Sequence, residues 1–315
     1  MERHLPRLHG SALRRLPGAA DPVEDLLQLL KEGTPMSTAD AASLKRRYDE
    51  VSPKYDQGGP NAMAIKLFWL TYEHLTWKPV EALLPRDGTS WRVLDAGGGG
   101  GKFGTRFAEA GHHVTVLDIS PGMLEGARAQ FGVKGLLDRV TFVEGNVAAL
   151  DLPDAAFDLV FCEGDPVSYC LDAYPSAVKE LVRVAKPGAP VVLGVDNRYE
   201  AFSGALKMGR PEEAFRTLQD GRTTCPYGLP VHAFTVRELE QAVAAAGAEL
   251  LEIFGKPVMF FDMLKAMAAA RGGSSDKPWD AWAAREEILA MQEKLAHEGF
   301  AVLGQHFQVM ARRRA

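Results

Sequence analysis

Five consecutive glycines, residues 97–101, follow a short apolar run that ends in the carboxylate Asp95. Ordering a glycine in a regular element costs roughly 0.5–1 kcal/mol relative to alanine. A chain accepts this cost where the backbone must turn tightly or come within contact distance of a ligand, since a side chain would prevent both. The glycine run therefore predicts a ligand-binding loop.

Short apolar runs alternate with helical patterns from residue 91 onward. Buried strands that alternate with helices form a parallel sheet that is covered on both faces. The predicted fold class is α/β, with a doubly wound, Rossmann-like sheet. Its strands are expected at residues 91–96, 113–119, 139–146, 157–164, 189–197, 248–256 and 305–313.

The remaining patterns predict a single domain at residues 36–315, preceded by an extension at 1–35. Helical patterns at 38–84 are expected to fold over the sheet as a lid. Two inserts, at about 199–231 and about 256–300, are expected to wall a substrate site, because connections on a rigid sheet carry specificity.

The composition excludes several classes of function. Of the 315 residues, 46% are hydrophobic and 24% charged, as in an ordinary globular protein. A net charge of -5 gives no basic field for nucleic acid or an anionic membrane, and no apolar run is long enough to span a bilayer. The three cysteines lack metal-binding spacing, so we expect no metal site, a reducing compartment and a cytoplasmic location.

Polar side chains follow the first three predicted strands. Asp95 precedes the glycine run, and Asp118 ends the next strand, where a carboxylate can accept hydrogen bonds from both hydroxyls of a ribose. After the third strand, Asn146 can bond the edge of an adenine while Val147 covers the ring. Asp118 and Asn146 also have plainer interpretations, as a helix cap and a turn residue.

The glycine run alone does not distinguish between nucleotide-binding families. The dinucleotide fingerprint G-x-G-x-x-G fits Gly97 and Gly99 but meets Lys102 where its third glycine belongs. Moved by one residue, the fingerprint meets Phe103 instead. A nicotinamide-dependent oxidoreductase is therefore disfavoured but stays an alternative, as does a cofactor-binding protein without catalytic activity.

In combination, the segments VLDAGGGGG, VTVLDISPGML, VEGNVAAL, FDLVFCEG and RVAKPGAPVVLGV resemble a class I S-adenosylmethionine-dependent methyltransferase. The resemblance covers about residues 45–255. It implies the strand order 3-2-1-4-5-7-6 and S-adenosyl-L-methionine as the cofactor. The glycines would hold the methionine and ribose part of that cofactor, and Asp95 would orient the loop or the cofactor amine. The cofactor-binding residues predicted on this basis are Tyr55, Asp95, Gly97, Gly99, Gly101, Asp118, Ile119, Asn146, Val147 and Glu163.

Methyl transfer is an in-line displacement, so the protein mainly orients two reactants and can also remove a proton. The methyl acceptor is expected beyond the fourth and fifth strands. The predicted catalytic residues are His232, as a general base, and Asp165, as a base or as the partner of a cationic acceptor. Simple packing for His232 and a helix cap for Asp165 remain open. The predicted substrate-binding residues are Tyr169, Asn197, Arg198 and Tyr199.

The expected acceptor is an O or N atom of a small molecule. A weaker likeness points to the bacterial tRNA wobble-uridine carboxymethyl methyltransferases, which makes tRNA the alternative acceptor. This second likeness is carried by YDEVSPKYD, by the DN after the fifth strand and by a last strand of the form F-x-V-x-A-R. No membrane partner is expected, and the oligomeric state is open.

Overall fold

The computed structural model describes residues 41–51, 62–225, 228–272, 280–297 and 299–315. The predicted extension at 1–35 lies outside the described residues. Residues 38–40 and 52–61 of the predicted lid, Tyr55 among them, also lie outside. The boundary between extension and domain therefore stays a prediction.

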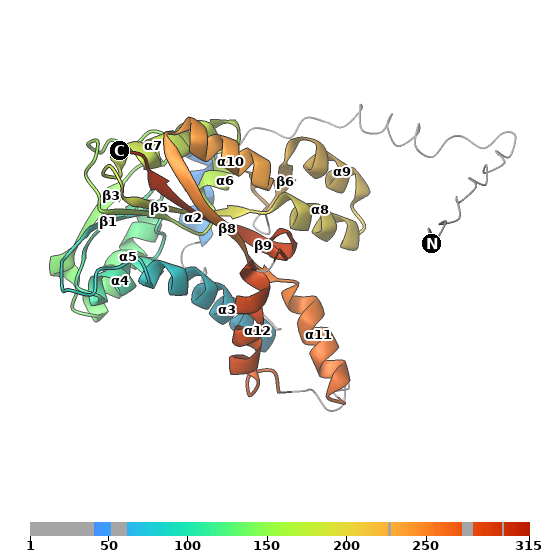
Figure 1. Cartoon of the computed structure of the whole chain (residues 1–315). Coiled ribbons are helices and arrows are strands. Elements are labelled where there is room, and N and C mark those ends of the chain that lie inside the picture. The colour runs from blue at the N-terminus through green and yellow to red at the C-terminus, as the bar shows by residue number, and fades with distance from the viewer. Residues whose placement is uncertain (1–40, 52–61, 226–227, 273–279, 298) are drawn as a thin grey trace, which may run out of the picture. The chain divides into compact units, whose positions relative to one another are not determined.

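A seven-stranded sheet forms the centre of the fold, in the order β3-β2-β1-β4-β5-β9-β8 (Figure 1). The first five strands along the chain pair in parallel, and β9 then pairs antiparallel with β5 and β8. Because β8 and β9 are the sixth and seventh strands of this sheet in chain order, the predicted strand order is confirmed. The strands are β1 Arg92–Ala96, β2 His113–Asp118, β3 Val140–Glu144, β4 Leu159–Cys162, β5 Pro190–Asp196, β8 Ala248–Val258 and β9 Gly304–Arg313.

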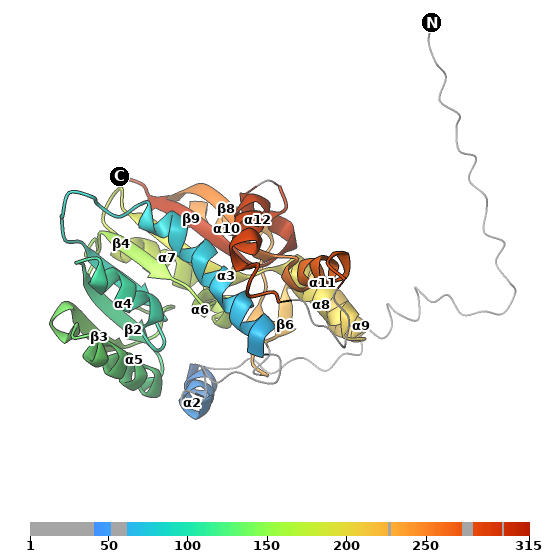
Figure 2. The ribbon, with the colours of Figure 1, turned by 90° about the horizontal axis from the view of Figure 1, so that it is seen from below.

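Helices cover both faces of the sheet, as the doubly wound prediction requires (Figures 1 and 2). No helix in the described part of the chain combines the length and the apolar composition that a membrane crossing needs. One face is covered by α3 Ala62–Glu81, α4 Lys102–Glu109, α5 Pro121–Val133 and α12 Arg285–His297. The other face is covered by α7 Tyr174–Val184 and α10 Val236–Ala245.

Strand β4 shows how the sheet comes to be buried on both sides. Phe161 packs with Phe107 of α4 and Phe131 of α5, whereas its neighbour Val160 packs with the cluster around Leu181 of α7. Successive strand residues point to opposite faces, so a strand between two helical layers must be apolar at every position. This requirement explains the continuous apolar runs in the sequence.

The two predicted inserts contain secondary structure of their own. The first holds α8 Arg198–Lys207, α9 Pro211–Asp220 and a hairpin of β6 Arg222–Thr224 with β7 Pro230–His232. The sequence patterns do not predict this hairpin, because its strands are three residues long and carry no apolar run. The second insert holds α11 Phe260–Ala270 and α12. The other elements are α2 Ala41–Val51, α6 Pro166–Tyr169 and the 3₁₀ turns Leu137–Arg139, Leu171–Ala173 and Ala301–Leu303.

Two helix starts follow the capping chemistry that the sequence predicts. The hydroxyl of Ser120 accepts a hydrogen bond from Met123 N, with Pro121 at the first helical position of α5. Thr235 and Glu238 form a reciprocal capping box at the start of α10. Asp118 is therefore not the cap of α5, which leaves its carboxylate available for another role.

The 3₁₀ turn before β9 and the first residue of β9 pack tightly against Gly255 of β8. A side chain on Gly255 would collide with the carbonyl oxygen of Ala301, and its Cβ would lie 2.9 Å from the Ala301 Cα. A Cβ on Gly304 would in turn lie 2.5 Å from the Gly255 Cα. These are backbone atoms, which cannot swing aside as the end of a long side chain can. The tight packing of β8 against this turn and the start of β9 therefore depends on both glycines.

We expect Gly255→Ala to lower the free energy of unfolding by roughly 1–3 kcal/mol, the usual cost of overpacking. Gly126→Ala is the matched control, because a Cβ at this helical position of α5 meets nothing within 4 Å. Alanine there should raise the free energy of unfolding by roughly 0.5–1 kcal/mol. Urea denaturation of both variants measures the two effects. Equal shifts in the same direction would contradict the close approach.

Candidate functional site

A cavity of about 1570 Å³ opens at the carboxyl ends of the parallel strands. Its walls come from the loops after β1 to β5, from α3 and from both inserts. Ligands of parallel sheets bind at this end of the strands. A single small ligand usually occupies roughly 300–1,000 Å³, so the cavity has room for two reactants side by side.

The glycine run adopts a backbone that other residues rarely take. Gly97, Gly99 and Gly101 have φ angles of 70°, 52° and 80°, in the left-handed region that favours glycine. A side chain on Gly97 would also collide with Pro166. Residues 97–100 line the cavity, whereas Gly101 stands at the start of α4 and is not among the described lining residues. The bare backbone of the loop thus faces the cavity.

Asp95 lies behind this loop and not in the cavity wall. The residue is 2% exposed, and a Cβ on either Gly98 or Gly104 would come within 2.9 Å of its Oδ2. Burial raises the pKa of Asp95 to about 7; the backbone of Gly104 opposes this rise, and the charges of Asp118 and Glu163 add to it. Of the two predicted roles, this position supports orientation of the loop.

Asp118 connects the glycine loop to the next strand. Its two carboxylate oxygens accept hydrogen bonds from Gly99 N and Ser120 N, both at 2.9 Å. Burial raises the pKa of Asp118, although these backbone bonds oppose the rise. The side chain is buried, yet it lines the cavity, and each oxygen keeps a lone pair for a ligand hydroxyl.

The loops after β2 and β3 supply the neighbouring wall. Ile119, Asn146 and Val147 all line the cavity, as predicted for one ligand site. Asn146 Oδ1 accepts a hydrogen bond from Ala148 N at 2.9 Å, which is the turn geometry that the sequence leaves open. The amide nitrogen of the same side chain is not needed for this turn.

Glu163, directly after β4, is held by a buried polar network. Tyr72 of α3 donates a hydrogen bond to Glu163 Oε1, and the ammonium of Lys256 on β8 lies 2.8 Å from the same oxygen. Lys256 is fully buried and also donates to Thr76 Oγ1 at 2.7 Å and Gln308 Oε1 at 2.6 Å. Burial lowers the pKa of Lys256, and the charge of Glu163 opposes this shift. Glu163 Oε2 has no hydrogen-bond partner among the described residues.

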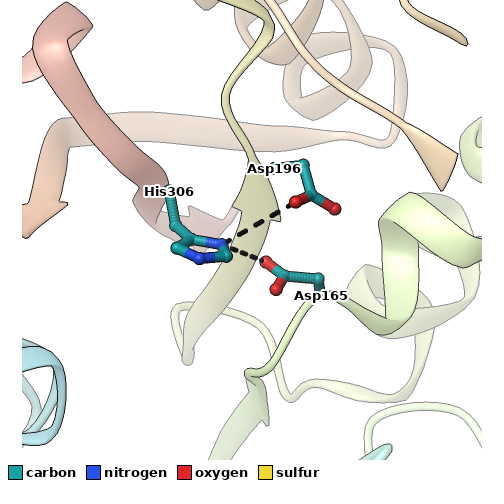
Figure 3. A group of neighbouring side chains, drawn as sticks. All are labelled: Asp165, Asp196 and His306. Atoms are coloured by element: carbon teal, nitrogen blue, oxygen red, sulfur yellow. Dashed lines mark hydrogen bonds and ion pairs between the residues drawn. The ribbon is translucent and has the colours of Figure 1, made fainter. Parts of the chain in front are cut away.

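Three side chains from three elements meet beside this network (Figure 3). Asp165 follows β4, Asp196 ends β5 and His306 lies on β9. Nδ1 of His306 is 3.1 Å from Asp165 Oδ1 and 4.0 Å from Asp196 Oδ1. All three residues line the cavity, and one polar atom of each lies within 4.8 Å of the others, a spacing that a single cation can bridge.

The backbone of Asp165 turns its carboxylate toward this group. Its φ is 69°, unusual for a residue other than glycine, and its side chain makes no capping hydrogen bond to α6. The helix-cap interpretation of Asp165 is therefore wrong. Strained backbone of this kind is typical of functional sites.

The two carboxylates and the imidazole shift one another's protonation. Burial alone lowers the pKa of His306, but the charge and hydrogen bond of Asp165 and the charge of Asp196 outweigh it and raise the pKa to about 9. Burial, and then the charge of Asp165, raises the pKa of Asp196 to about 7. At neutral pH the group therefore contains an imidazolium held by Asp165.

The structure does not bring His232 to the cavity. In the short strand β7, Val231 lines the cavity and His232 points to the opposite side, because strand side chains alternate. His232 instead stacks on Tyr174, with ring centroids 4.9 Å apart, and its Nε2 lies 3.5 Å from Glu238 Oε1. The packing interpretation of His232 thus agrees with the structure, and the role of general base does not.

Of the four predicted substrate-binding residues, two line the cavity and two do not. Tyr169 and Asn197 line the cavity, but the Asn197 side chain caps α8 and donates to the carbonyl oxygens of Val302 and Gly304. Arg198 is buried in an ion pair with Glu238 at 2.6 Å and does not line the cavity. Tyr199 is 41% exposed and also lies outside the described lining. Tyr55 lies outside the described residues.

Sequence reasoning missed His306 as a site residue. The strand at 305–313 was expected, and its polar residues carried the signal: His306 and Gln308 stand two apart, on either side of Phe307. Such a spacing puts both side chains on one face. Two polar groups on one buried strand face need partners, and these partners turn out to be Asp165 and Lys256.

The raised pKa of His306 gives a prediction for stability. Because the folded pKa of about 9 exceeds the ordinary value of 6.5, the stabilisation is complete below pH 6.5 and is lost as the pH rises through 9. His306→Gln should therefore be less stable than the parent at pH 6, by at most about 3 kcal/mol, and the difference should shrink by pH 9.5. Urea denaturation across this range measures it.

The control for this prediction is His297→Gln, which removes an imidazole paired with Glu252 on the surface. A gap between parent and His306→Gln that stays constant from pH 6 to pH 9.5 would contradict the ion pair in the cavity.

Part of the chain is similar in sequence to known methyltransferases. Residues 93–188 match the family model described as a methyltransferase domain. The ubiquinone/menaquinone biosynthesis C-methyltransferase of Rhodopseudomonas palustris is 36% identical over 148 residues, 41% of this chain and 56% of the relative. The malonyl-[acyl-carrier protein] O-methyltransferase of Erwinia pyrifoliae is 32% identical over 187 residues, 59% of this chain and 63% of the relative.

One solved structure extends the likeness to most of the fold. The 1,6-didemethyltoxoflavin-N1-methyltransferase of Burkholderia thailandensis, solved with its substrate and S-adenosylhomocysteine, superposes with a TM-score of 0.52. The match covers 90% of this chain and 93% of that one at 20% identity, so it concerns the fold alone. The chain spans 56% and 63% of the length of the two sequence relatives. Motifs, strand order and family model agree: residues 93–188 match a methyltransferase domain, and the sheet has the strand order that the class I resemblance implies.

Proposed function

We propose that this protein transfers a methyl group from S-adenosyl-L-methionine to an O or N atom of a small molecule. One observation carries the proposal: a single cavity runs from the glycine loop and Asp118 to the polar group of Asp165, Asp196 and His306. A cofactor-binding half and a reactive half thus share one open cavity. The similar proteins include a C-methyltransferase of quinone biosynthesis and an N-methyltransferase, which support methylation of a small molecule without deciding the atom.

The residues of the cofactor half fit S-adenosylmethionine. The side-chain-free loop at 97–100 leaves space for the methionine part, and Asp118 offers oxygens for the ribose diol. Ile119, Asn146 and Val147 would hold the adenine, and Glu163 lies where the sulfonium end would come. When bound, the cofactor supplies an electrophilic methyl group on a positively charged sulfur.

In the reactive half we propose Asp165 and His306 as the catalytic pair, with Tyr169 against the acceptor. Both members of the pair line the cavity. Once an acceptor has displaced their mutual hydrogen bond, the Asp165 carboxylate can take a proton and the His306 imidazolium can donate one. His232 is not proposed, because its side chain points away from the cavity that its neighbour Val231 lines. Arg198 and Glu238 would keep the surrounding insert in place.

The alternatives are less well supported. A nicotinamide dinucleotide would need the third glycine that Lys102 replaces. A tRNA acceptor stays a prediction that no contact in the cavity favours. A cytoplasmic location is proposed from the three free cysteines, which suit a reducing compartment.

Asp118→Ala should weaken the binding of S-adenosylhomocysteine about tenfold or more, since hydrogen bonds to a charged group contribute roughly 1.5–3 kcal/mol. Glu125→Ala is the matched control, because Glu125 is an exposed carboxylate on the helix that follows. Isothermal titration calorimetry of parent and variants, with NADH as a second ligand, measures the effect. If the parent protein bound NADH tightly and did not bind S-adenosylhomocysteine, the proposed function would be contradicted.

A further inference from the structure

We infer that the reactive half of the cavity is a binding site for an organic cation, so that the methyl acceptor is an amine with an apolar or aromatic body. This inference rests on the proposed function and adds the chemical class of the acceptor.

The first argument is an excess of carboxylates. Glu163, Asp165, Asp196 and Glu200 line this half of the cavity. Among the described residues, two cationic groups contact them: His306 in the wall, and Lys256 buried behind it. Lys207, which pairs with Asp262 on the surface, acts on Glu200 through its charge. Within this half, the charge of Asp165 acts on Asp196, and the charges of Lys207 and His306 act on Glu200. The carboxylates of this half of the cavity outnumber the cationic groups that contact them, and a cationic ligand would balance their charge.

The other cations of the cavity wall are engaged elsewhere. Arg210 pairs with Glu213 at 2.7 Å, and Lys102 pairs with Glu73 at 3.0 Å. Lys66 lies 4.5 Å from the centre of the Trp282 ring. None of the three reaches the group of Asp165, Asp196 and His306 in any contact of the described residues. An anionic acceptor would therefore meet repulsion there.

The second argument is a row of aromatic rings that leads to the acidic group. Phe261 of α11 stacks on Phe68 of α3, with centroids 5.6 Å apart and planes 6° from parallel. Phe68 stacks on Tyr72 at 6.4 Å, and Tyr72 meets the His306 ring edge to face at 5.3 Å. All of these rings line the cavity. Aromatic faces attract cations and pack against apolar bodies.

The third argument is an unpartnered oxygen at the junction of the two halves. Glu163 is 6% exposed and lines the cavity, and its Oε2 has no hydrogen-bond partner among the described residues. A buried carboxylate oxygen without a partner is costly, so a donor is expected there. The accepting nitrogen must come within about 3–3.5 Å of the methyl carbon, and a group at this boundary can contact its N–H.

These three features assign the parts of the acceptor. Its nitrogen lies among Glu163, Asp165 and Asp196, and its body lies along the aromatic row. Asp165 takes a proton from the ammonium and leaves a neutral amine. The nitrogen lone pair then forms the bond to the methyl carbon, the carbon–sulfur bond breaks, and its electron pair goes to sulfur. The methylated product is again a cation.

A metal ion is the competing occupant of the three-residue group, because one atom of each residue lies within 4.8 Å of the others. Metal ligands stand about 2.0–2.6 Å from their ion, and the aromatic row would contribute nothing to such a site. The row and the acidic group together therefore favour an organic cation.

The test uses the full chain saturated with S-adenosylhomocysteine and three probes of one skeleton. These are 2-phenylethylamine, 2-phenylethanol and 3-phenylpropionate. Isothermal titration calorimetry measures the binding of each probe. We expect the amine to bind about tenfold or more tightly than either the alcohol or the carboxylate. The double variant Asp165→Asn, Asp196→Asn should lose this preference. Asp172→Asn, at a carboxylate 73% exposed, should keep it.

Retained affinity for S-adenosylhomocysteine shows that the double variant is folded. Equal binding of the three probes, or tighter binding of the carboxylate, would overturn the inference and leave the proposed function standing. A third outcome would also overturn the inference: the parent binds Mn²⁺ in electron paramagnetic resonance, the double variant does not, and the parent shows no preference for the amine. Absence of S-adenosylhomocysteine binding to the parent protein would overturn the proposed function, and the inference with it.

Discussion

A buried ion pair between Glu163 and Lys256 connects the parallel half of the sheet to its antiparallel edge. Two charges this far from water are stable only because their attraction and further hydrogen bonds offset the loss of hydration. Tyr72, Thr76 and Gln308 provide those bonds. Removing one partner of such a pair typically costs about 3–5 kcal/mol. The same pair fixes the carboxylate at the junction of the cavity, so core stability and site geometry depend on one contact.

The space for this carboxylate comes from the neighbouring strand. A side chain on Gly194 of β5 would collide with the carboxyl group of Glu163. The cavity therefore depends on missing side chains in two places, the loop at 97–100 and the strand beside Glu163. In the loop the backbone itself faces the ligand, whereas in β5 the glycine admits a charged group from the same protein. Only the first kind stands out in a sequence, since a single glycine within a strand has many explanations.

The sequence patterns predicted the sheet, and the family resemblance predicted its strand order. Most of the predicted cofactor-binding residues line the cavity, and their binding role stays a prediction. Periodicity and helix-capping patterns are local, and Asp118 and Asn146 follow strands whose carboxyl ends must meet at one edge. The reactive half was harder. His306 and Asp165 are 141 positions apart, and they meet only because β9 inserts beside β5. For His232 the prediction was wrong by one residue. The short hairpin of β6 and β7 turns the side chain of Val231, and not that of His232, toward the cavity.

The position of His306 in the last strand has a consequence for how the protein is made. The loop at 97–100, Asp118 and Asn146 all belong to the first half of the chain, and the strands that carry them pair with one another. Their site is synthesised more than a hundred residues before β9 leaves the ribosome. β9 also separates β5 from β8, so the antiparallel edge and the buried pair of Glu163 and Lys256 form last. In a nascent chain, the side of the cavity that is built on the loop at 97–100 is therefore synthesised well before the side that carries His306.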